Sequence, residues 1–401
     1  MKRTLASIAV VLAAALAGVG PGVASAAGAQ RPADRWHPAE MELGGYSPYT
    51  NWRRPILKLP AAAPTNFLAV AEEDVAQAGH WSNRHGWYCG YLRCAHGPYP
   101  IATIWSEVHY FQAVDALQIA APSPAHAALV RHFGWANMKY WDHRMKAFAP
   151  YPGDRGGHVN VFFDDSGWLG LALVEAYRAT GEHRWLDMAQ KDFRFIAAHG
   201  WDRRHGGMWW NTWHTAHSGI AIAVDSLLGT LLYQADGETW QARTALKYIN
   251  WSLTSHEPYW REQFIAAPII YAEQLLCERG FGPGYCVDAG RMAATLAEED
   301  ERGLGGVREY AYNYGPQYDT AFLQWMMAYG QATGETFWRR LAEVNAAAAA
   351  VNARGASGLF LGSWWGGPFG NNEVLPHEFQ TAGATGALLA WTAVYAQQPV
   401  G

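Results

Sequence analysis

The feature that most constrains this fold is the spacing of its apolar residues, which recur at helical intervals almost continuously from Asn66 to the end of the chain. No stretch shows convincing strand-like alternation. The sequence therefore predicts an all-α fold with about twelve helices. We expect them over residues 66–79, 103–120, 124–146, 165–180, 182–199, 214–235, 237–256, 262–279, 286–302, 316–332, 335–352 and 377–396.

A short turn motif recurs at three predicted helix boundaries. In each copy a glycine can adopt the left-handed conformation that ends one helix, and a tryptophan one turn into the next helix can pack back on the first. The three glycines are 56 and then 97 residues apart, so the second interval is close to two units of about fifty residues. The copies are Ala179-Thr-Gly181 with Trp185, Ala235-Asp-Gly237 with Trp240, and Ala332-Thr-Gly334 with Trp338.

Twelve helices with this repeat make six helical hairpins. A hairpin of about fifty residues cannot bury its own apolar face, so several hairpins must share a core. Six of them can close into an (α/α)6 barrel, whose loops at one end form a cleft. An open solenoid is the alternative, but the chain stops at six pairs and neither terminal pair resembles a polar cap. The pattern favours the closed barrel.

The first 26 residues are typical of a secretory signal peptide. Lys2 and Arg3 precede an apolar stretch from Leu5 to Val19, and Ala24-Ser25-Ala26 offers a cleavage site of small residues. The apolar stretch is too short for a membrane span, and no later segment has about eighteen uninterrupted apolar residues. We therefore expect a secreted protein, cleaved after residue 26, with no membrane span.

The rest of the chain divides into an arm and one domain. Residues 27–64 are rich in proline and lack helical periodicity, so an extended N-terminal arm is expected ahead of one (α/α)6 domain over residues 65–401. The four cysteines form two close pairs, Cys89 with Cys94 and Cys277 with Cys286. In an oxidising compartment two local disulfides are the simplest arrangement, whereas free thiols or a metal site are less favoured because zinc spacing is absent.

Charge and aromatic content indicate the kind of ligand. Loss of the signal peptide removes two positive charges and changes the formal net charge from -5 to -7, which argues against a nucleic-acid partner. The 21 Trp and 20 Tyr exceed what packing requires, although most must serve the core. Aromatic rings bind the C–H face of a pyranose. A neutral sugar ligand is expected, with no cofactor, and the protein is expected to be a monomer.

Asp164 and Asp165 are adjacent acids at the predicted start of a helix. One interpretation is structural: Asp164 would be the N-cap, and Asp165 would complement the helix dipole. The other is catalytic, because neighbouring side chains at a helix start diverge, and carboxyls roughly 5 Å apart suit a retaining glycoside hydrolase. Mutual repulsion and the apolar neighbours Phe162, Phe163 and Trp168 would keep one acid protonated and the other ionised.

Four segments together resemble glycoside hydrolase family 76, and the resemblance runs from about residue 65 to the end of the chain. The last of these segments is similar to the family's Tyr-Asn-Gln-Gly. They are Asp164-Asp165-Ser-Gly-Trp168, Glu175-Ala-Tyr177-Arg-Ala-Thr-Gly181, Gly206-Gly207-Met-Trp209-Trp210-Asn211 and Tyr312-Asn313-Tyr314-Gly315.

The resemblance implies an (α/α)6 barrel and endo-acting, retaining hydrolysis of α-1,6-linked mannan. It implies that Asp164 is the nucleophile and Asp165 the general acid and base. The chain departs from the family where many relatives carry Lys-Asn, since His214 and His217 stand there, and Tyr314 replaces the Gln. These positions are expected to shape the sugar subsites.

Candidate sugar-binding residues follow from the same segments. Trp209 and Trp210 are candidates for a stacking platform, although consecutive side chains do not easily face one cleft. Asn211, Tyr312 and Asn313 could bond sugar hydroxyls, or they could brace loops. No metal site is expected, because no nearby carboxylate completes one with the neighbouring histidines.

Two other functions remain open from the sequence. A transglycosylase would use the same covalent intermediate and pass the sugar to another sugar hydroxyl instead of water. A catalytically inert glycan-binding protein could have kept the barrel and its aromatic residues, although it would have no need of two repelling carboxylates. The leading prediction is an α-1,6-mannanase or a closely related α-mannosidase.

Overall fold

The computed structural model describes residues 66–95, 100–154, 156, 158–254, 263–302, 315–364 and 377–397. All of them belong to one contact unit, Pro38–Gly401. The predicted signal peptide, the predicted arm over residues 27–64, and Tyr312 and Asn313 lie outside the described residues.

The described residues form twelve α-helices, which confirms the predicted class and places most helix ends within a few residues of those expected. Three short 3-10 helices also occur, η3 (Ala78–Trp81), η4 (Leu92–Cys94) and η5 (Met138–Tyr140). The α-helices are α1 (Phe67–Gln77), α2 (Ile104–Ala120), α3 (Pro124–Asn137), α4 (Phe163–Thr180), α5 (His183–His199), α6 (Gly219–Asp236), α7 (Thr239–Thr254), α8 (Gln263–Glu278), α9 (Pro283–Arg302), α10 (Pro316–Thr333), α11 (Thr336–Asn352) and α12 (Phe379–Ala396).

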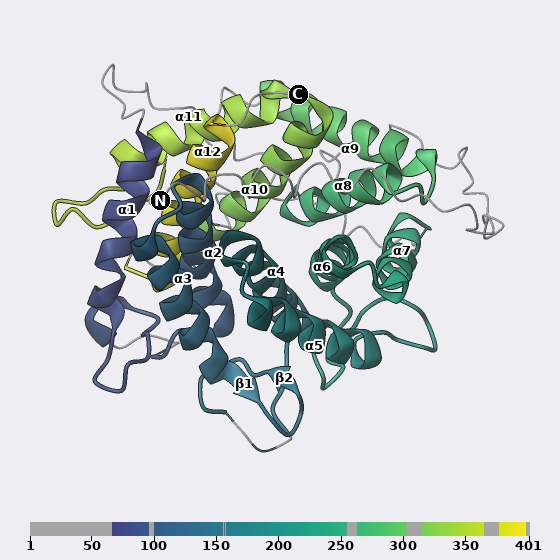
Figure 1. Ribbon diagram of the computed structural model, residues 1–401, viewed down its shortest axis with the longest axis horizontal. Coiled ribbons are helices and arrows are strands. Elements are labelled where there is room, and N and C mark those ends of the chain that lie inside the picture. The colour runs from purple at the N-terminus through teal and green to yellow at the C-terminus, as the bar shows by residue number, and fades with distance from the viewer. Residues whose placement is uncertain are drawn as a thin grey trace, which may run out of the picture. The chain divides into compact units, whose positions relative to one another are not determined.

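The even-numbered helices form a closed inner ring. Each packs on the next even-numbered helix, and α12 returns to α2 (Figure 1). The odd-numbered helices lie outside, where α3, α5, α7, α9 and α11 pack on the inner helices that precede them. The sixth pair joins the last helix to the first, because α1 packs on α12. The architecture is an (α/α)6 barrel.

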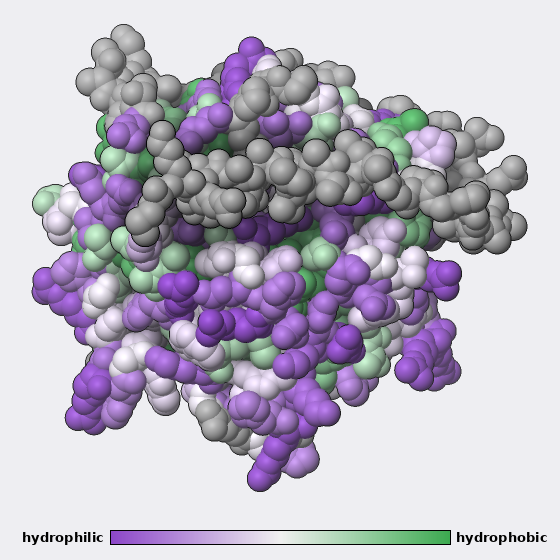
Figure 2. Space-filling view, in the orientation of Figure 1, coloured by the Kyte–Doolittle hydropathy of each residue, from purple (hydrophilic) through white to green (hydrophobic). Residues whose placement is uncertain are grey.

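Burial separates the two layers. The inner helices are covered on all sides, with 14 of 17 residues buried in α2 and 15 of 18 in α12. The outer helices bury one face only, with 5 of 14 residues buried in α3 and 7 of 17 in α5. Hydrophilic residues cover much of the lower part of the face in Figure 2, where Figure 1 places α3 and α5.

The inner helices begin at the same end of the barrel. Trp105, in the first turn of α2, has its ring centroid 5.6 Å from Trp168 in α4 and 5.6 Å from Tyr318 in α10. Tyr318 in turn lies 4.9 Å from Phe264 in α8. The first turns of α2, α8 and α10 and the second turn of α4 therefore meet in a cluster of aromatic rings, so these helices start at one end of the barrel.

The three predicted glycine turns end α4, α6 and α10. Gly181, Gly237 and Gly334 have φ values of 71°, 78° and 81°, the left-handed conformation that glycine adopts without steric cost. The tryptophans that follow differ in their partners. Trp338 packs back on Phe322 of α10, as expected. Trp185 instead packs on the preceding hairpin, where its ring lies 6.3 Å from Phe111.

Two predicted helices were too long. The helix expected over residues 124–146 ends at Asn137, and a two-stranded antiparallel ribbon follows, formed by β1 (Trp141–Asp142) and β2 (Ala147–Phe148). The Asp142 carboxylate accepts hydrogen bonds from the backbone N–H groups of Arg144 and Met145, which favours a turn over a further helical turn.

The helix expected from residue 214 begins instead at Gly219. His214 has a φ of 55°, which interrupts a helix, and the Ser218 hydroxyl accepts a hydrogen bond from the Ala221 N–H as an N-cap. Residues 209–218 are therefore a loop, and the histidines that the sequence placed in a helix lie within it.

Both predicted disulfides are present. Cys89–Cys94 closes a short loop, and Cys277–Cys286 ties the end of α8 to the first turn of α9. Within the described part of the chain, no group of three or more His, Cys, Asp and Glu side chains is arranged to hold a metal ion. No described helix combines the length and apolarity needed to cross a bilayer.

Candidate active site

Asp164 and Asp165 are the second and third residues of α4. The interpretation of Asp164 as the N-cap is wrong, because the helix begins at Phe163 and its N-cap is Phe162, which makes no side-chain capping bond. The early start follows from backbone pairing, since the Phe163 N–H donates to the Trp210 carbonyl over 2.9 Å. Asp164 is therefore a helical residue whose carboxylate is available for other contacts.

Two N–H groups donate to the Asp164 carboxylate. Oδ1 accepts from the Asp165 backbone N–H, and Oδ2 accepts from Nε1 of Trp210, both over 2.9 Å. Burial raises the pKa of Asp164 to about 7, because the side chain is only 5% exposed, while both N–H donors oppose that rise by stabilising the anion. Asp164 is thus a buried carboxyl group with specific support for its charged form.

Asp165 is partly exposed. Burial raises its pKa well above the usual range, and the charge of Asp164 raises it further. The two acids form a coupled pair in which the first ionisation opposes the second. Because Asp164 has the N–H donors, ionisation of Asp164 is favoured over ionisation of Asp165. One carboxylate and one carboxylic acid on adjacent residues are the two species that retaining glycoside hydrolysis requires.

The loop over residues 209–218 is bonded to the segment that leads into α4. Phe162 pairs with Asn211, and the Thr212 N–H donates to the Val161 carbonyl over 2.9 Å. The Val161 N–H donates to Thr212 Oγ1 over 3.0 Å. These bonds fix the loop against the first turn of α4, and they place the Trp210 indole on Asp164.

The two candidate platform tryptophans have different environments. Trp210 is 42% exposed and meets Phe162 edge to face at 5.0 Å. Trp209 is partly buried and stacks on His214 at 4.7 Å, with His217 at 4.4 Å on its ring. Trp210 therefore offers an open ring beside Asp164, whereas Trp209 packs within the loop.

The other predicted binding residues are placed as follows. Asn211 is 1% exposed and braces the loop: its Nδ2 donates to Thr215 Oγ1 over 2.6 Å, and its Oδ1 accepts from the Trp213 N–H over 3.1 Å. Tyr312 and Asn313 lie outside the described residues. His217 and His205 both hydrogen-bond to the Asp202 carboxylate. These side chains therefore stabilise the local structure around the loop.

Sequence reasoning missed the aromatic residues that other helices bring to the same end. Trp105 and Tyr318 are partly exposed and lie one beside the other, next to Trp168, which is one turn along α4 from Asp164. Their position in the sequence could have identified them as site residues, because each stands in the first turn of a predicted inner helix. Aligning the starts of the alternate helices would have grouped them with Asp164.

Two further buried acids lie behind the pair. Ser166 donates to Asp192 Oδ1 over 3.1 Å, and Asp225 of α6 packs on Gly167, where a Cβ atom would lie 2.3 Å from its Oδ1. Burial raises the pKa of both acids well above the usual range, and the charge of Asp164 adds to the rise for Asp225. Burial therefore favours the neutral form of both acids, which favours a polar, uncharged wall behind the pair.

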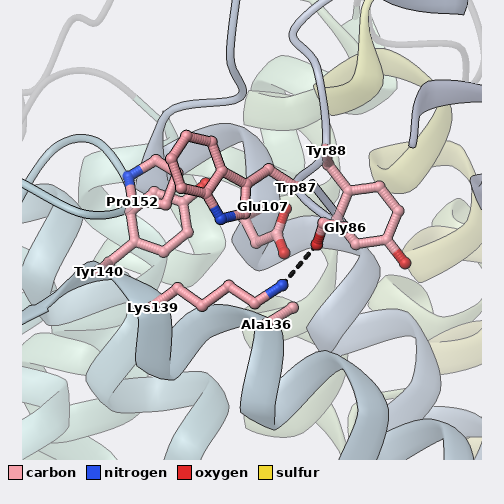
Figure 3. Close-up of a pocket in the computed structure, with 8 residues that line it drawn as sticks. All are labelled: Gly86, Trp87, Tyr88, Glu107, Ala136, Lys139, Tyr140 and Pro152. Carbon is pink, nitrogen blue, oxygen red and sulfur yellow. Dashed lines mark hydrogen bonds between the residues drawn. The ribbon is translucent and has the colours of Figure 1, made fainter. Parts of the chain in front are cut away.

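A narrow hollow lies elsewhere, between α2, α3, η5 and the segment around Trp87 (Figure 3). Lys139 reaches across it and donates to the Gly86 carbonyl, while the buried Glu107 carboxyl lies behind (Figure 3). Burial raises the pKa of Glu107 to about 8, against the opposing charge of Lys139. The hollow leaves no room for a water molecule and contains neither Asp164 nor Asp165, so we do not place a ligand there.

Comparisons with known proteins bear on the family and the fold of this chain. Residues 75–260 match the family model of glycosyl hydrolase family 76. No curated protein sequence matches the chain. A family 76 mannosidase from Bacteroides thetaiotaomicron has a similar structure, with a TM-score of 0.70, 16% identity, and coverage of 83% of this chain and 99% of that one.

Two other solved structures are also similar to this chain. An inactive variant of an α-1,6-mannanase from a Salegentibacter species, in complex with α-1,6-mannotriose, has a TM-score of 0.62 and 14% identity, over 82% of this chain and 99% of its own. A cellobiose 2-epimerase from Spirochaeta thermophila has a TM-score of 0.58 and 13% identity, over 84% and 99%. The barrel alone therefore does not define the reaction.

The matched segment contains the Asp164-Asp165 pair, the glycine turns after α4 and α6, and the loop that bonds Asp164. The fold of the family 76 structures extends over most of the remaining helices. The match over residues 75–260 places this segment of the chain in glycoside hydrolase family 76.

Proposed function

We propose that this protein is a secreted, retaining glycoside hydrolase that cleaves α-1,6-mannosidic linkages in mannan-type polysaccharides. The observation that carries the proposal is the adjacent acid pair at the start of α4, with Asp164 bonded by Trp210 and Asp165 beside it. The Salegentibacter α-1,6-mannanase is inactive when two consecutive aspartates are replaced, and this chain has a single Asp-Asp sequence, within its matched segment.

The first chemical step forms a covalent intermediate. The Asp164 carboxylate attacks the anomeric carbon of a mannose unit, and the glycosidic C–O bond breaks. The carboxylic acid of Asp165 gives its proton to the leaving oxygen. This step needs one ionised and one protonated acid, which matches the direction in which the two pKa values are separated.

The second step reverses the roles. The Asp165 carboxylate accepts a proton from water as the water oxygen attacks the anomeric carbon, and the bond to Asp164 breaks. Two inversions at one carbon leave the anomeric configuration unchanged. Asp165 ends the cycle protonated and Asp164 ionised, as both began.

The aromatic surroundings suit a neutral sugar. Trp210, Trp105 and Tyr318 keep part of each ring open at the end of the barrel that holds the pair. A pyranose ring can stack on such faces while its hydroxyls bond the rim. Stacking that fixes the sugar beside Asp164 lowers the entropic cost of the attack.

The proposed location is outside the cell. The two disulfides are consistent with an oxidising compartment, and residues 1–26 match the pattern of a secretory signal. Mass spectrometry of the protein from culture medium should find a mature N-terminus at Ala27. Intact protein starting at Met1 and retained in cells would contradict this part of the proposal.

Linear α-1,6-mannan is the substrate that tests linkage and stereochemistry together. Proton NMR of the first-formed product should show the α-anomer ahead of mutarotation. Asp164→Asn and Asp165→Asn should each reduce turnover by at least about a thousandfold, while the exposed Asp187→Asn should retain it. A first-formed β-anomer, or full activity in either pair variant, would refute the mechanism.

The two roles can be assigned with azide and an aryl α-mannooligoside whose leaving group needs no acid. In Asp165→Ala, azide should attack the glycosyl-enzyme and give the α-mannosyl azide. In Asp164→Ala, azide should attack the substrate directly and give the β-mannosyl azide. The opposite pattern would exchange the roles. Binding of mannan with no turnover by the wild-type protein would favour an inert glycan-binding protein, and longer products with excess acceptor would favour a transglycosylase.

A further inference from the structure

Trp213 lies in the loop over residues 209–218, which bonds Asp164 through Trp210. Its own ring has no evident structural role among the described residues. Its side chain is 64% exposed, more than the other exposed tryptophans, Trp135 at 53% and Trp210 at 42%. In the part of the chain that the structure describes, its ring stacks on no other aromatic ring and on no cation. Leaving a large apolar ring in water forgoes the stabilisation that burial would give.

Trp135 shows what an exposed tryptophan looks like when it has a structural partner. It lies on the outer helix α3, where it meets the buried Trp185 edge to face at 5.7 Å. The Arg184 guanidinium lies 5.6 Å from its ring. These contacts explain the position of Trp135, and the described residues make no comparable ring contacts with Trp213.

The backbone around Trp213 is nevertheless fixed. Its N–H donates to Oδ1 of Asn160 over 3.3 Å and to Oδ1 of Asn211 over 3.1 Å. The next residue, His214, has a φ of 55°, a conformation that non-glycine residues rarely adopt, and its ring stacks on Trp209. Its N–H closes a turn on the Asn211 carbonyl over 3.0 Å. The exposed ring of Trp213 is therefore attached to a turn whose backbone is fixed by hydrogen bonds.

That turn lies at the catalytic end of the barrel. Trp210, three residues earlier, donates to Asp164, so the Cα atoms of the two tryptophans are about 11 Å apart at most. An oligosaccharide that passes the Trp210 ring can reach this distance, whereas a single sugar bound at Asp164 cannot. A chain substrate is thus the ligand that would use both rings.

We propose that Trp213 is the platform of an additional sugar subsite, beyond those that flank the cleaved linkage, and that it makes the enzyme prefer longer mannan chains. The inference rests on the proposed mannanase function and adds a preference for the length of the mannan chain. Binding at this subsite is remote from the reacting atoms, so it acts equally on the bound substrate and the transition state. Its loss therefore raises KM and leaves kcat little changed.

The experiment measures kcat and KM for α-1,6-mannooligosaccharides of increasing length with the wild type, Trp213→Ala, Trp213→Tyr and the control Trp135→Ala. For Trp213→Ala we expect a loss in kcat/KM that grows with chain length to about tenfold, expressed in KM. Trp213→Tyr should recover most of that loss. Trp135→Ala should match the wild type at every length.

A reducing-end-labelled oligosaccharide gives a second readout. Trp213→Ala should change which linkage is cut first, because one anchoring contact is gone. An equal loss at every chain length, or no loss at any length, overturns the subsite. A change in oligomeric state by light scattering with an unchanged length dependence assigns Trp213 to a protein interface and also overturns it. An inactive wild type would instead refute the proposed function itself.

Discussion

At the residue scale, two N–H donors, the Asp165 backbone amide and the Trp210 indole, favour ionisation of Asp164 before Asp165. Trp210 donates to Oδ2 of Asp164, and a bond to a carboxylate is stronger than one to the neutral acid. Asp165 instead faces the charge of Asp164, which raises its pKa. Trp210 is partly exposed while its N–H bonds the proposed nucleophile, so in the proposed mechanism one side chain would connect substrate binding with acid strength.

Trp210→Phe tests this role because it keeps an aromatic ring beside Phe162 and removes the donor. The pKa of Asp164, about 7 in the wild type, should rise, because its anion loses one supporting bond. Since Asp164 acts as a carboxylate, the acid limb of the kcat/KM profile should move to higher pH. A charge-assisted bond contributes about 1.5–3 kcal/mol, so a shift of about one to two pH units is expected.

The control for this measurement is Trp135→Phe, on the outer helix α3, which should keep the wild-type profile. Both pH profiles should be recorded with a substrate far below KM, so that they report the free enzyme. An unmoved acid limb in Trp210→Phe would mean that the indole does not set the ionisation of the nucleophile.

The sequence predicted only part of this site. The acid pair and the Gly-Gly-x-Trp-Trp-Asn loop stood out through their resemblance to the family, and both lie together as expected. Trp105 and Tyr318 did not stand out, because 63 residues separate Trp105 from Trp168 and 213 residues separate it from Tyr318. The bracing role of Asn211 depends on the turn at His214, and local propensity does not predict a positive φ for histidine.

At the element scale, glycines set the distance between inner helices α4 and α6. A Cβ atom on Gly170 would lie 2.5 Å from the tip of Leu228, and one on Gly167 would lie 2.8 Å from Val224. The backbone of α4 at these glycines therefore packs directly against the side chains of α6. This close contact fixes the first turn of α4, and with it the acid pair, relative to the buried Asp225.

Gly170→Ala should destabilise the protein. The added methyl group must displace Leu228, which is fully buried, and overpacking of this kind costs about 1–3 kcal/mol. The matched control is Gly284→Ala in the first turn of α9, where a Cβ atom meets nothing within 4 Å. That change should be neutral or stabilise by up to about 1 kcal/mol. Urea unfolding of both variants gives the comparison, and equal midpoints would contradict it.

Helix ends were predictable where their chemistry is local. Gly181, Gly237 and Gly334 end helices through their own backbone freedom, and Ser123 begins α3 with Pro124 after it. The end of α3 was missed because the turn at Asp142 competes with a helix whose apolar pattern continues past it. The hydrogen bonds from the neighbouring backbone N–H groups to the Asp142 side chain favoured a turn, although the apolar periodicity predicted a helix there.

At the scale of the whole molecule, the ring is closed by contacts between the two ends of the domain. The Trp81 indole and the Leu92 N–H both donate to the His377 carbonyl, over 3.0 and 2.9 Å. The Phe379 N–H donates to the Gly90 carbonyl over 2.9 Å, and the Tyr91 hydroxyl donates to Glu378. These partners are almost 300 residues apart, so periodicity could suggest closure but could not identify the residues that make it.

The closed ring also has a polar interior. Gln324 of α10 donates across to Glu175 of α4 over 2.7 Å, while the other carboxyl oxygen of Glu175 has no hydrogen-bond partner. Burial raises the pKa of Glu175 to about 8, against the opposing effects of Arg178 and Gln324. A protonated Glu175 fits this interior, and an ionised one does not.

This raised pKa makes stability fall as the pH rises. Between the ordinary value of 4.5 and about 8, the folded protein holds a proton on Glu175 that the unfolded chain has lost. Over that window the free energy of unfolding decreases by up to about 1.4 kcal/mol per pH unit, and below it Glu175 contributes no pH dependence. Glu175→Gln can still accept the bond from Gln324 and cannot ionise.

Glu175→Gln should therefore be more stable than the wild type at pH 7.5, by on the order of 2 kcal/mol, with the difference shrinking toward pH 5. Urea unfolding midpoints at half-unit pH intervals provide the measurement, and the exposed Asp187→Asn should follow the wild-type slope. Parallel curves for Glu175→Gln and the wild type would mean that the barrel accommodates a charge at Glu175, and the neutral interior inferred from its burial would be wrong. Converging curves would instead show that the pH range in which the protein stays folded depends on a buried acid that lies along α4 from the proposed catalytic pair.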